Sequence, residues 1–299
     1  MDKKKLLIGF IGQGFIGKNM ADDFEGRGYQ VVRYDKELNL ANKEKIKECD
    51  FVFIAVPTPS TPEGFNDDIL KEVLSLVGNQ KTAIIKSTIK VGTTEKFQAL
   101  YPEKYILHSP EFLTEKNAAN DTKFPPRNVV GYTKKSKDKA AEVLSILPKA
   151  KHNFLVNSRE AELVKYMGNN FLFLKVIFSN LMYNLASRKG LDYDSIIEIV
   201  ACDPRISHSH LQINHQSGHS EKKGRGAGGH CFIKDMSALV EMFEEEPLAN
   251  REDKLSLELL KKIVELNKQL LIDSQKDLDL LEGVYGKNVI LNNNSQKNE

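Results

Sequence analysis

The sequence predicts an α/β fold in which an N-terminal doubly wound sheet precedes a helical domain built on one long central helix. Two observations carry this prediction. Short apolar runs alternate with amphipathic segments through the first half of the chain, which is typical of a parallel sheet covered on both faces. One unusually long helical pattern then opens the second half, over residues 158–189.

The first half supplies the strands and helices of the expected sheet domain. The strands are expected at residues 5–12, 30–35, 50–57, 82–88, 104–109 and 127–132. Helices are expected between them, among others at residues 16–27, 66–77 and 136–147. Because strands that alternate with helices build βαβ units, we expect one parallel-sheet domain over residues 1–155.

The long pattern over residues 158–189 predicts a single helix. Ser158, with Glu162 nearby, is a plausible start, and Gly190 is a plausible stop. The centre of this helix is apolar on most faces, so something must cover it. We expect a homodimer formed through this helix.

The remaining chain is expected to complete a helical dimerisation and catalytic domain over residues 156–283. Further helices are predicted at residues 192–201, 235–245 and 252–282, and the glycine-, serine- and histidine-rich stretch 203–234 is expected to be a loop. Residues 284–299 are expected to begin as a strand and to continue as a polar tail.

Composition excludes several classes of protein. The formal net charge of the 299 residues is +2, too small to argue for nucleic-acid binding. No apolar run approaches the roughly 20 residues of a membrane span. Cys49, Cys202 and Cys231 are few, odd in number and far apart, which does not resemble a disulfide framework. We therefore expect a cytoplasmic protein.

The first glycine-rich turn carries a dinucleotide fingerprint. Gly12, Gly14 and Gly17 follow the first expected strand and open the first expected helix. Gly12 permits a tight turn, Gly14 lets a pyrophosphate approach the backbone, and Gly17 lets helix and strand pack. Asp35 ends the next strand, where it can accept hydrogen bonds from a ribose. This favours NAD over NADP, although neighbouring Lys36 weakens the preference, and it indicates a Rossmann domain.

Two further loops follow expected strands of the same sheet. The stretch AVPTPS (55–60) contains Pro57 and Thr58, and the stretch KSTIKVGTT (86–94) contains Ser87 and Thr88. Parallel sheets bind ligands at the carboxyl ends of their strands, so these loops are candidates for cofactor contacts.

Taken together, the motifs resemble the UDP-glucose/GDP-mannose dehydrogenase family. The matching stretches are GFIGQGFIG, VPTP, KSTIKVGTT, SPEFLTEKNAAND with PPRNVVG, AELVKYMGNNFLFLKVIFSN, DPRI and GAGGHCFIKD. The resemblance implies NAD-dependent oxidation of the C6 alcohol of a nucleotide sugar to a carboxylate. It also implies a third, nucleotide-binding domain, of which GKNVILNNN resembles the first strand and the rest is missing here.

The resemblance assigns the chemistry to a set of residues around Cys231, whose thiolate would form a thiohemiacetal and then a thioester. Lys165 and Asn169 would stabilise the developing alkoxide, and Asp235 would position water or assist deprotonation. Glu115 would be the base for thioester hydrolysis, with Thr88 holding water.

The expected site residues form three overlapping groups. The catalytic residues are Cys231, Lys165, Asn169, Asp235, Glu111, Glu115 and Thr88. The NAD contacts are Gly12, Gly14, Phe15, Ile16, Gly17, Asp35, Lys36, Pro57, Thr58, Ser87, Thr88, Glu115 and Lys234. The substrate contacts are Glu111, Phe112, Leu113, Lys165, Asn169, Arg205, Gly228, Gly229 and Cys231. The glycines before Cys231 would let backbone amides approach a sugar ring, and nearby Lys234 could favour the thiolate.

Three alternatives remain at this stage. His208, His210, His215 and His219 crowd one loop and could bind zinc, although their spacing matches no familiar structural site. The chain could instead be a catalytically weak NAD-binding paralogue that regulates or assembles with another chain. It could also oxidise a smaller hydroxy substrate, which would not need a cysteine.

Overall fold

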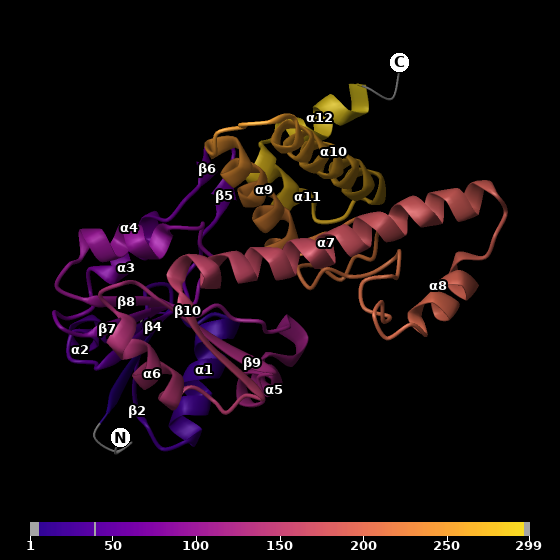
Figure 1. Ribbon diagram of the computed structural model, residues 1–299. Coiled ribbons are helices and arrows are strands. Elements are labelled where there is room, and N and C mark those ends of the chain that lie inside the picture. The colour runs from indigo at the N-terminus through magenta and orange to yellow at the C-terminus, as the bar shows by residue number, and fades with distance from the viewer. Residues whose placement is uncertain (1–5, 39, 296–299) are drawn as a thin grey trace. The chain divides into compact units, whose positions relative to one another are not determined.

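The computed structural model describes residues 6–38 and 40–295, and the chain divides into two compact units (Figure 1). Unit 1 contains residues 1–58 and 66–165. Unit 2 contains residues 59–65 and 166–299. The boundary falls inside the longest helix, between Lys165 and Tyr166. None of the described helices is both long enough and apolar enough to cross a membrane.

Unit 1 is built on one mixed sheet of eight strands in the order β10-β9-β8-β7-β4-β1-β2-β3. The strands are β1 (Leu7–Ile11), β2 (Gln30–Asp35), β3 (Leu40–Ala41), β4 (Phe51–Ile54), β7 (Thr82–Ile85), β8 (Tyr105–His108), β9 (Arg127–Tyr132) and β10 (His152–Asn157). All residues of β4 and β7 are buried, so both faces of the central sheet are covered. The α/β prediction is thereby confirmed, and each of the six expected strands occurs at its expected place along the chain.

The helices of unit 1 are α1 (Phe15–Gly26), α2 (Lys43–Ile46), α3 (Asp68–Leu74), α4 (Thr93–Leu100), η2 (Glu115–Asn117), α5 (Ala118–Lys123) and α6 (Lys137–Ile146). One large core joins the sheet to α1 and α6. At its centre Phe10 stacks on Phe53 with 5.2 Å between ring centroids, and Phe24 of α1 meets Phe10 edge-on at 5.3 Å. This packing fixes α1, and with it the turn before α1, against the sheet.

The expectation that all strands run parallel is wrong at both edges of the sheet. Strands β8, β7, β4, β1 and β2 are parallel. At one edge β9 pairs antiparallel with β8 and β10 runs parallel to β9, and at the other edge the short β3 pairs antiparallel with β2. An apolar run shows that a segment is a buried strand and does not show its direction. Strand β10 was not predicted, because its residues are mostly exposed and its apolar run is only three residues long, Phe154 to Val156.

Helix α7 (Ser158–Arg188) has the predicted extent, but its start is built differently. Asn157 Oδ1 accepts from the Glu160 N–H at 2.9 Å, and Glu160 Oε2 accepts from the Asn157 N–H at 3.0 Å, forming a capping box. Glu162 does not cap its own helix. Its buried carboxylate accepts from the backbone N–H groups of Gly92, at 2.6 Å, and Thr94, at 2.8 Å, at the start of α4. Burial raises the pKa of Glu162 to about 7.

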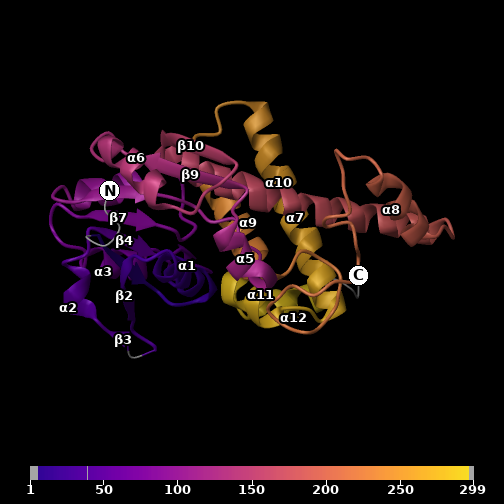
Figure 2. The ribbon, with the colours of Figure 1, turned by 90° about the horizontal axis from the view of Figure 1, so that it is seen from below.

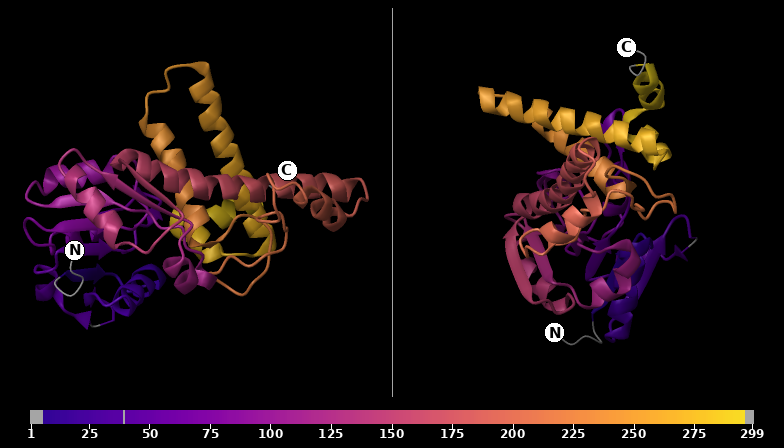
Figure 3. Two further views of the ribbon diagram at one scale, coloured as in Figure 1. Left: turned by 60° about the horizontal axis from the view of Figure 1, so that its bottom comes forward. Right: turned by 90° about the vertical axis from the view of Figure 1, so that its right-hand side faces the viewer.

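Unit 2 is mainly helical. It contains residues 166–188 of α7, α8 (Tyr193–Ala201), α9 (Gly229–Glu245), α10 (Arg251–Ser274), α11 (Leu278–Tyr285), α12 (Asn288–Ser295) and a small hairpin of β5 (Ser60–Thr61) and β6 (Gly64–Phe65). Helix α8 lies beside the C-terminal end of α7 (Figures 1 and 2), where Tyr183 and Tyr193 meet edge-on with their ring centroids 5.5 Å apart. Helices α9 and α10 form a hairpin (Figure 3).

Three expectations for unit 2 are corrected. Helix α9 starts at Gly229, so Cys231 lies in the first helical turn and not in a loop. The predicted helix 252–282 is two helices, because Gln275 and Asp277 adopt left-handed backbone conformations that end α10. The expected strand at 286–294 is helix α12. The last residues of the expected tail, 296–299, lie outside the described residues.

Candidate active site

The turn between β1 and α1 has the geometry that its glycines predict. Gly12 has φ +84°, and a Cβ placed there would lie 2.3 Å from the Ala55 carbonyl oxygen. A Cβ on Gly17 would lie 1.9 Å from the Gly12 carbonyl oxygen, so neither position accepts a side chain. At Gly14, the N-cap of α1, an added Cβ would meet no described atom within 4 Å. The turn is therefore tight on the protein side and open at the end of the helix that attracts phosphate.

Asp35 stands beside this turn at the end of β2. Its Oδ2 accepts from the Gln13 N–H at 2.7 Å, and its Oδ1 accepts from the Glu37 N–H at 3.0 Å. These bonds hold the carboxylate next to the fingerprint, where an adenosine ribose binds in dinucleotide folds. Lys36 is exposed and lies 3.8 Å from Glu72. The open Gly14, the start of α1 and Asp35 together fit NAD. Phe15 and Ile16 form the first turn of α1.

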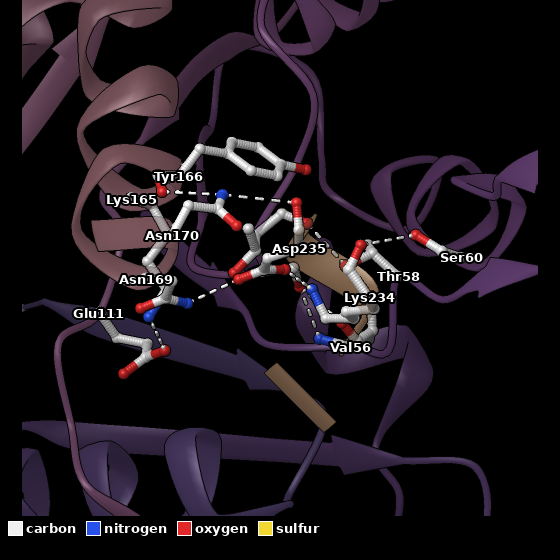
Figure 4. Close-up of polar contacts among 12 residues, drawn as sticks. Val56, Thr58, Ser60, Glu111, Lys165, Tyr166, Asn169, Asn170, Lys234 and Asp235 are labelled. Atoms are coloured by element: carbon white, nitrogen blue, oxygen red, sulfur yellow. Dashed lines mark hydrogen bonds and ion pairs between the residues drawn. The ribbon is translucent and has the colours of Figure 1, made fainter. Parts of the chain in front are cut away.

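The next two sheet ends are joined by hydrogen bonds between their loops (Figure 4). Ser87 Oγ accepts from the Val56 N–H at 3.0 Å and donates to the Val56 carbonyl at 2.6 Å. Thr58 Oγ1 donates to the Thr88 carbonyl at 2.7 Å. Ser87 and Thr58 thus tie the loop after β4 to the loop after β7. Pro57 lies in the first of these loops, between Val56 and Thr58 in sequence.

Glu111 and Lys165 form a buried ion pair in unit 1, with 2.8 Å between Oε1 and Nζ (Figure 4). Glu111 Oε2 also accepts from the Leu113 N–H at 2.6 Å. The Phe112 ring lies 5.9 Å from Lys165 Nζ. The structure therefore brings together four of the sequence-predicted residues of unit 1. Glu115 is exposed at the first residue of η2.

Lys86 and His108 are buried beside this pair, and the sequence reasoning missed both. Lys86 Nζ donates to Ser109 Oγ at 3.2 Å and to the Pro110 carbonyl at 3.3 Å. Burial lowers the pKa of Lys86 to about 8 and that of His108 to about 3. The available signal was a lysine and a histidine at the ends of strands expected to be fully buried, where charged groups are rare.

In unit 2 the structure gathers Asn169, Lys234 and Asp235 (Figure 4). Asp235 is 1% exposed; its Oδ2 accepts from Asn169 Nδ2 at 2.6 Å and its Oδ1 pairs with Lys234 Nζ at 2.5 Å. Lys234, expected to favour the Cys231 thiolate, is thus paired with a carboxylate. Its backbone carbonyl accepts from Ser60 Oγ at 3.1 Å.

Cys231 occupies the third position of α9, whose N-cap is Gly228. The thiol is exposed. The N-terminus of a helix presents N–H groups and the positive end of the helix dipole, which favours a thiolate. Cys231 thus lies in the first turn of α9, the position to which this general effect applies.

Arg205 lies on an exposed segment after α8. Its guanidinium pairs with Asp203 at 2.6 Å, and its side chain is 87% exposed. Among the described residues, Arg205 therefore pairs with its sequence neighbour Asp203, and no contact is seen with another predicted site residue of unit 2.

The histidine-rich loop does not assemble a metal site from the described residues. No group of three or more His, Cys, Asp or Glu side chains in that part of the chain is placed to hold a metal ion. His219 instead lies between His230, at 3.1 Å, and Asp279, at 2.7 Å. His215 lies 3.2 Å from Lys276 Nζ.

The sheet order, the open fingerprint turn and the acid at the end of β2 define unit 1 as a dinucleotide-binding domain. Comparison with known proteins is more specific. Residues 32–147 match the NAD binding domain of the UDP-glucose/GDP-mannose dehydrogenase family, and residues 159–269 match its central domain. The chain belongs to the UDP-glucose/GDP-mannose dehydrogenase family.

Individual proteins show the same similarity. The UDP-glucose 6-dehydrogenase YwqF of Bacillus subtilis is 31% identical over 92% of this chain and 59% of its own length. A UDP-glucose dehydrogenase structure from Pyrobaculum islandicum has a TM-score of 0.73 at 26% identity, covering 91% of this chain and 72% of that one. A 3-hydroxyisobutyrate dehydrogenase from Mycobacterium tuberculosis shares the fold, with a TM-score of 0.65 at 18% identity over 88% and 94% of the two chains.

The chain spans less than two thirds of the length of the curated relatives that it matches. The shares are 59% for YwqF, 61% for the putative UDP-glucose 6-dehydrogenase YtcA and 46% for TuaD, all of Bacillus subtilis.

Proposed function

We propose that the protein oxidises the C6 alcohol of a nucleotide sugar of the UDP-glucose type to a carboxylate, with Cys231 as the nucleophile. The carrying observation is the helix start that holds Cys231, together with Asp235 four residues later in the same helix and bonded to Asn169. The similarity to the UDP-glucose 6-dehydrogenases YwqF and TuaD of Bacillus subtilis supports the substrate class.

NAD, held at the fingerprint turn of Gly12, Gly14 and Gly17 beside Asp35, would supply the hydride acceptor for the two oxidation steps, one NAD for each step. The residues of the chain do the rest. In the first step the alcohol becomes an aldehyde, and its proton is lost to solvent. Lys165 and Asn169 are donors for the negative charge that develops on the C6 oxygen. Asp235 fixes the orientation of the Asn169 amide through the 2.6 Å bond.

The thiolate of Cys231 adds to the aldehyde carbon and forms a thiohemiacetal. Loss of the second hydride gives a thioester on Cys231. Water then adds to the thioester carbonyl, the C–S bond breaks, and the carboxylate and the Cys231 thiol are released. Glu115, exposed on η2, is the proposed base for this water, and Thr88 would hold it.

The test is a count of NADH formed per sugar oxidised. The purified full chain would be incubated with NAD and a panel of nucleotide sugars. We expect two NADH per sugar, abolished in Cys231→Ser. Cys202→Ser is the matched control, because Cys202 is also an exposed cysteine of unit 2, and its turnover should not change.

Other results would support the alternatives. NADH binding without turnover of any sugar would support a non-catalytic NAD-binding role. One NADH per molecule of a small hydroxy acid, retained in Cys231→Ser, would support the smaller-substrate dehydrogenase.

We also propose that the protein forms a homodimer through α7. Within unit 2 this helix exposes apolar side chains at alternating intervals of four and three residues, the period of helices that pack side by side. They are Met167, Phe171, Leu174, Phe178, Leu181 and Leu185, of which Met167 is 73% exposed. A second copy of the chain would present the same stripe.

Sedimentation velocity tests the dimer. Phe171→Asp should shift the protein to the monomer, because it places a charge in the middle of the apolar stripe. Phe124→Asp is the control, since Phe124 is equally exposed, at 65% against 63%, but lies outside α7. A wild-type protein that sediments as a monomer would refute the proposal.

A further inference from the structure

We propose that two residues of the corner between α10 and α11 (residues 275–277), Lys276 and Asp277, position the turn and helix start that carry Cys231. The positioning residues are Lys276 and Asp277, both buried in unit 2 with the loop that they hold. The inference rests on the proposed function, in which Cys231 is the nucleophile. The corner lies far in sequence from the motifs that contain Cys231 and the other candidate site residues.

Asp277 bonds two parts of the chain before Cys231: residues 217–220 of the loop, and the first residue of α9. Its Oδ2 accepts from the N–H of Gly229, the first residue of α9, at 2.9 Å. Its Oδ1 accepts from Ser217 Oγ at 3.0 Å and from Ser220 Oγ at 3.3 Å. Since Asp277 is 4% exposed, little solvent is at hand to replace these bonds. One buried carboxylate therefore fixes the helix start, two residues before Cys231.

Lys276 holds the preceding stretch of the same loop. Its Nζ donates to the carbonyl oxygens of Gly226, at 3.0 Å, and Gly224, at 3.3 Å. It also faces His215 Nε2 at 3.2 Å. Burial lowers the pKa of His215 to about 4, so this imidazole is neutral near pH 7 and can accept. The Lys276 ammonium is thus surrounded by acceptors from the loop.

Helix α10 continues the same pattern towards the corner. Asn267 Oδ1 accepts from the Ala227 N–H at 2.7 Å, and Asn267 Nδ2 donates to the Ala227 carbonyl at 3.0 Å. Ser274 Oγ accepts from the Arg225 N–H at 2.9 Å. Side chains of residues 267–277 therefore bond backbone groups of residues 224–227 and of Gly229.

The glycines of this loop make room for the corner. A Cβ on Gly228 would lie 2.1 Å from Asp277 Oδ2, and a Cβ on Gly224 would lie 2.7 Å from Ser274 Cβ. The expectation that these glycines open space for a sugar is therefore incomplete, because side chains of the protein occupy that space at Gly224 and Gly228.

The backbone of the corner is itself unusual. Gln275 has φ +55° and Asp277 has φ +51°, a left-handed conformation that side chains other than glycine rarely adopt. Such residues persist where their surroundings hold them in place, and they often occur at functional sites. Here the bonds of Lys276 and Asp277 to the loop supply that hold.

The experiment measures the reactivity of Cys231 in Asp277→Ala. Iodoacetamide alkylation of the full chain would be followed by mass spectrometry of each cysteine, with Cys202 as the internal reference. Cys231 is already exposed, so loosening the helix start adds little access and removes support for the thiolate. We expect its alkylation rate and kcat to fall about tenfold, as for one lost bond to a charged group. The rate at Cys202 and the KM for NAD should not change.

Gln275→Asn is the matched control. It alters the same corner, asparagine tolerates the left-handed conformation, and Gln275 Nε2 donates to Ile272 of its own helix. Both rates should stay at the wild-type value. Asp277→Asn, which keeps one acceptor oxygen, should give an intermediate effect, and it replaces Asp277→Ala if that variant does not fold.

Two outcomes would overturn the proposal. One is an Asp277→Ala or Asp277→Asn protein with wild-type melting temperature, Cys231 alkylation and kcat. The other is a Gln275→Asn protein as impaired as Asp277→Ala. If the wild-type protein oxidises no sugar, the proposed function fails, but the alkylation comparison still decides the role of the corner.

Discussion

The two units each contain a glycine-rich turn that leads into a helix, and the two turns use glycine differently. Before α1, Gly12 and Gly17 are packed against backbone carbonyls. A Cβ added at Gly14 would meet no described atom within 4 Å. Before α9, Gly224 and Gly228 are pressed against side chains of residues 274–277. The first turn is therefore shaped to receive a ligand, and the second is held by the protein behind it. Glycines therefore leave space for a ligand in the first turn and for side chains of the protein itself in the second.

Each unit also holds a buried lysine and a histidine. Unit 1 buries Lys86 and His108, and unit 2 buries Lys276 beside the half-buried His215. In unit 2 the lysine and histidine contact each other at 3.2 Å. In unit 1 neither ring nitrogen of the buried His108 has a partner among the described residues. The His215 imidazole therefore has a partner for Nε2, while its Nδ1, like both nitrogens of His108, has none among the described residues.

The largest effect is expected from Gly17→Ala. The new Cβ would lie 1.9 Å from a backbone carbonyl oxygen that is fixed by the sheet, so relief requires moving a strand or α1. We expect a loss of at least about 4 kcal/mol in the free energy of unfolding of unit 1. Thermal denaturation and NADH fluorescence titration would measure it. A variant that keeps the wild-type melting temperature would contradict the described turn.

Gly228→Ala should cost less, because the new Cβ would meet a side-chain oxygen, Asp277 Oδ2, at 2.1 Å. We expect a loss of about 3 kcal/mol in the free energy of unfolding. Asp277→Ala removes the obstructing carboxylate, so the double variant should be more stable than the sum of the single effects predicts. Urea denaturation of the four proteins measures this coupling, and strict additivity would show that Gly228 and Asp277 do not meet.

The buried His108 makes stability depend on pH. Burial lowers its pKa to about 3 from the ordinary value of 6.5, which it has in the unfolded chain. The folded state therefore resists protonation, and the contribution of His108 is fully present above pH 6.5 and is lost as the pH falls towards 3. Between pH 7 and pH 5 the loss should be about 2 kcal/mol.

His108→Leu would test this pH dependence. The variant should flatten the dependence of the urea midpoint between pH 7 and pH 5, because leucine does not titrate and leaves no buried nitrogen unsatisfied. The control is His152→Asn, at an exposed position of β10. An unchanged slope in His108→Leu would show that other groups cause the acid sensitivity.

The smallest effect on stability is expected from Gly14→Ala, since the new methyl group meets no described atom. The free energy of unfolding should change by no more than about 0.5 kcal/mol, so the melting temperature should stay close to that of the wild-type protein. NADH affinity should nevertheless fall, because the methyl group occupies the place where a pyrophosphate approaches the start of α1. Isothermal titration with NADH checks this, and unchanged affinity would place the cofactor elsewhere.

Most of unit 1 could be predicted from sequence because its signals are local. The fingerprint glycines, the apolar strands and Asp35 each lie within a short window. The pairing of Glu111 with Lys165 could be anticipated only from the family resemblance, since 54 residues separate them. Lys86 and His108 were missed because the sequence does not show that a lysine or histidine at a strand end points inward.

Unit 2 was less predictable where backbone geometry is set by distant contacts. The extent of α7 and its stop at Gly190, which has φ +65°, follow from a local pattern. The start of α9 does not, because two glycines precede Cys231 and glycine disfavours helix. Asp277 is bonded to the Gly229 N–H and stabilises that start from 48 residues away.

The sequence by itself determined the α/β class, the cofactor turn and the chemical types of the candidate site residues. These depend on residue identity and on short-range periodicity, which the chain carries in every conformation. The tertiary structure alone decided the reversed direction of β9, the helical setting of Cys231 and the contacts of the α10–α11 corner with the loop before α9. Each of these depends on hydrogen bonds between segments far apart in the chain, and such bonds leave no periodic pattern in the sequence.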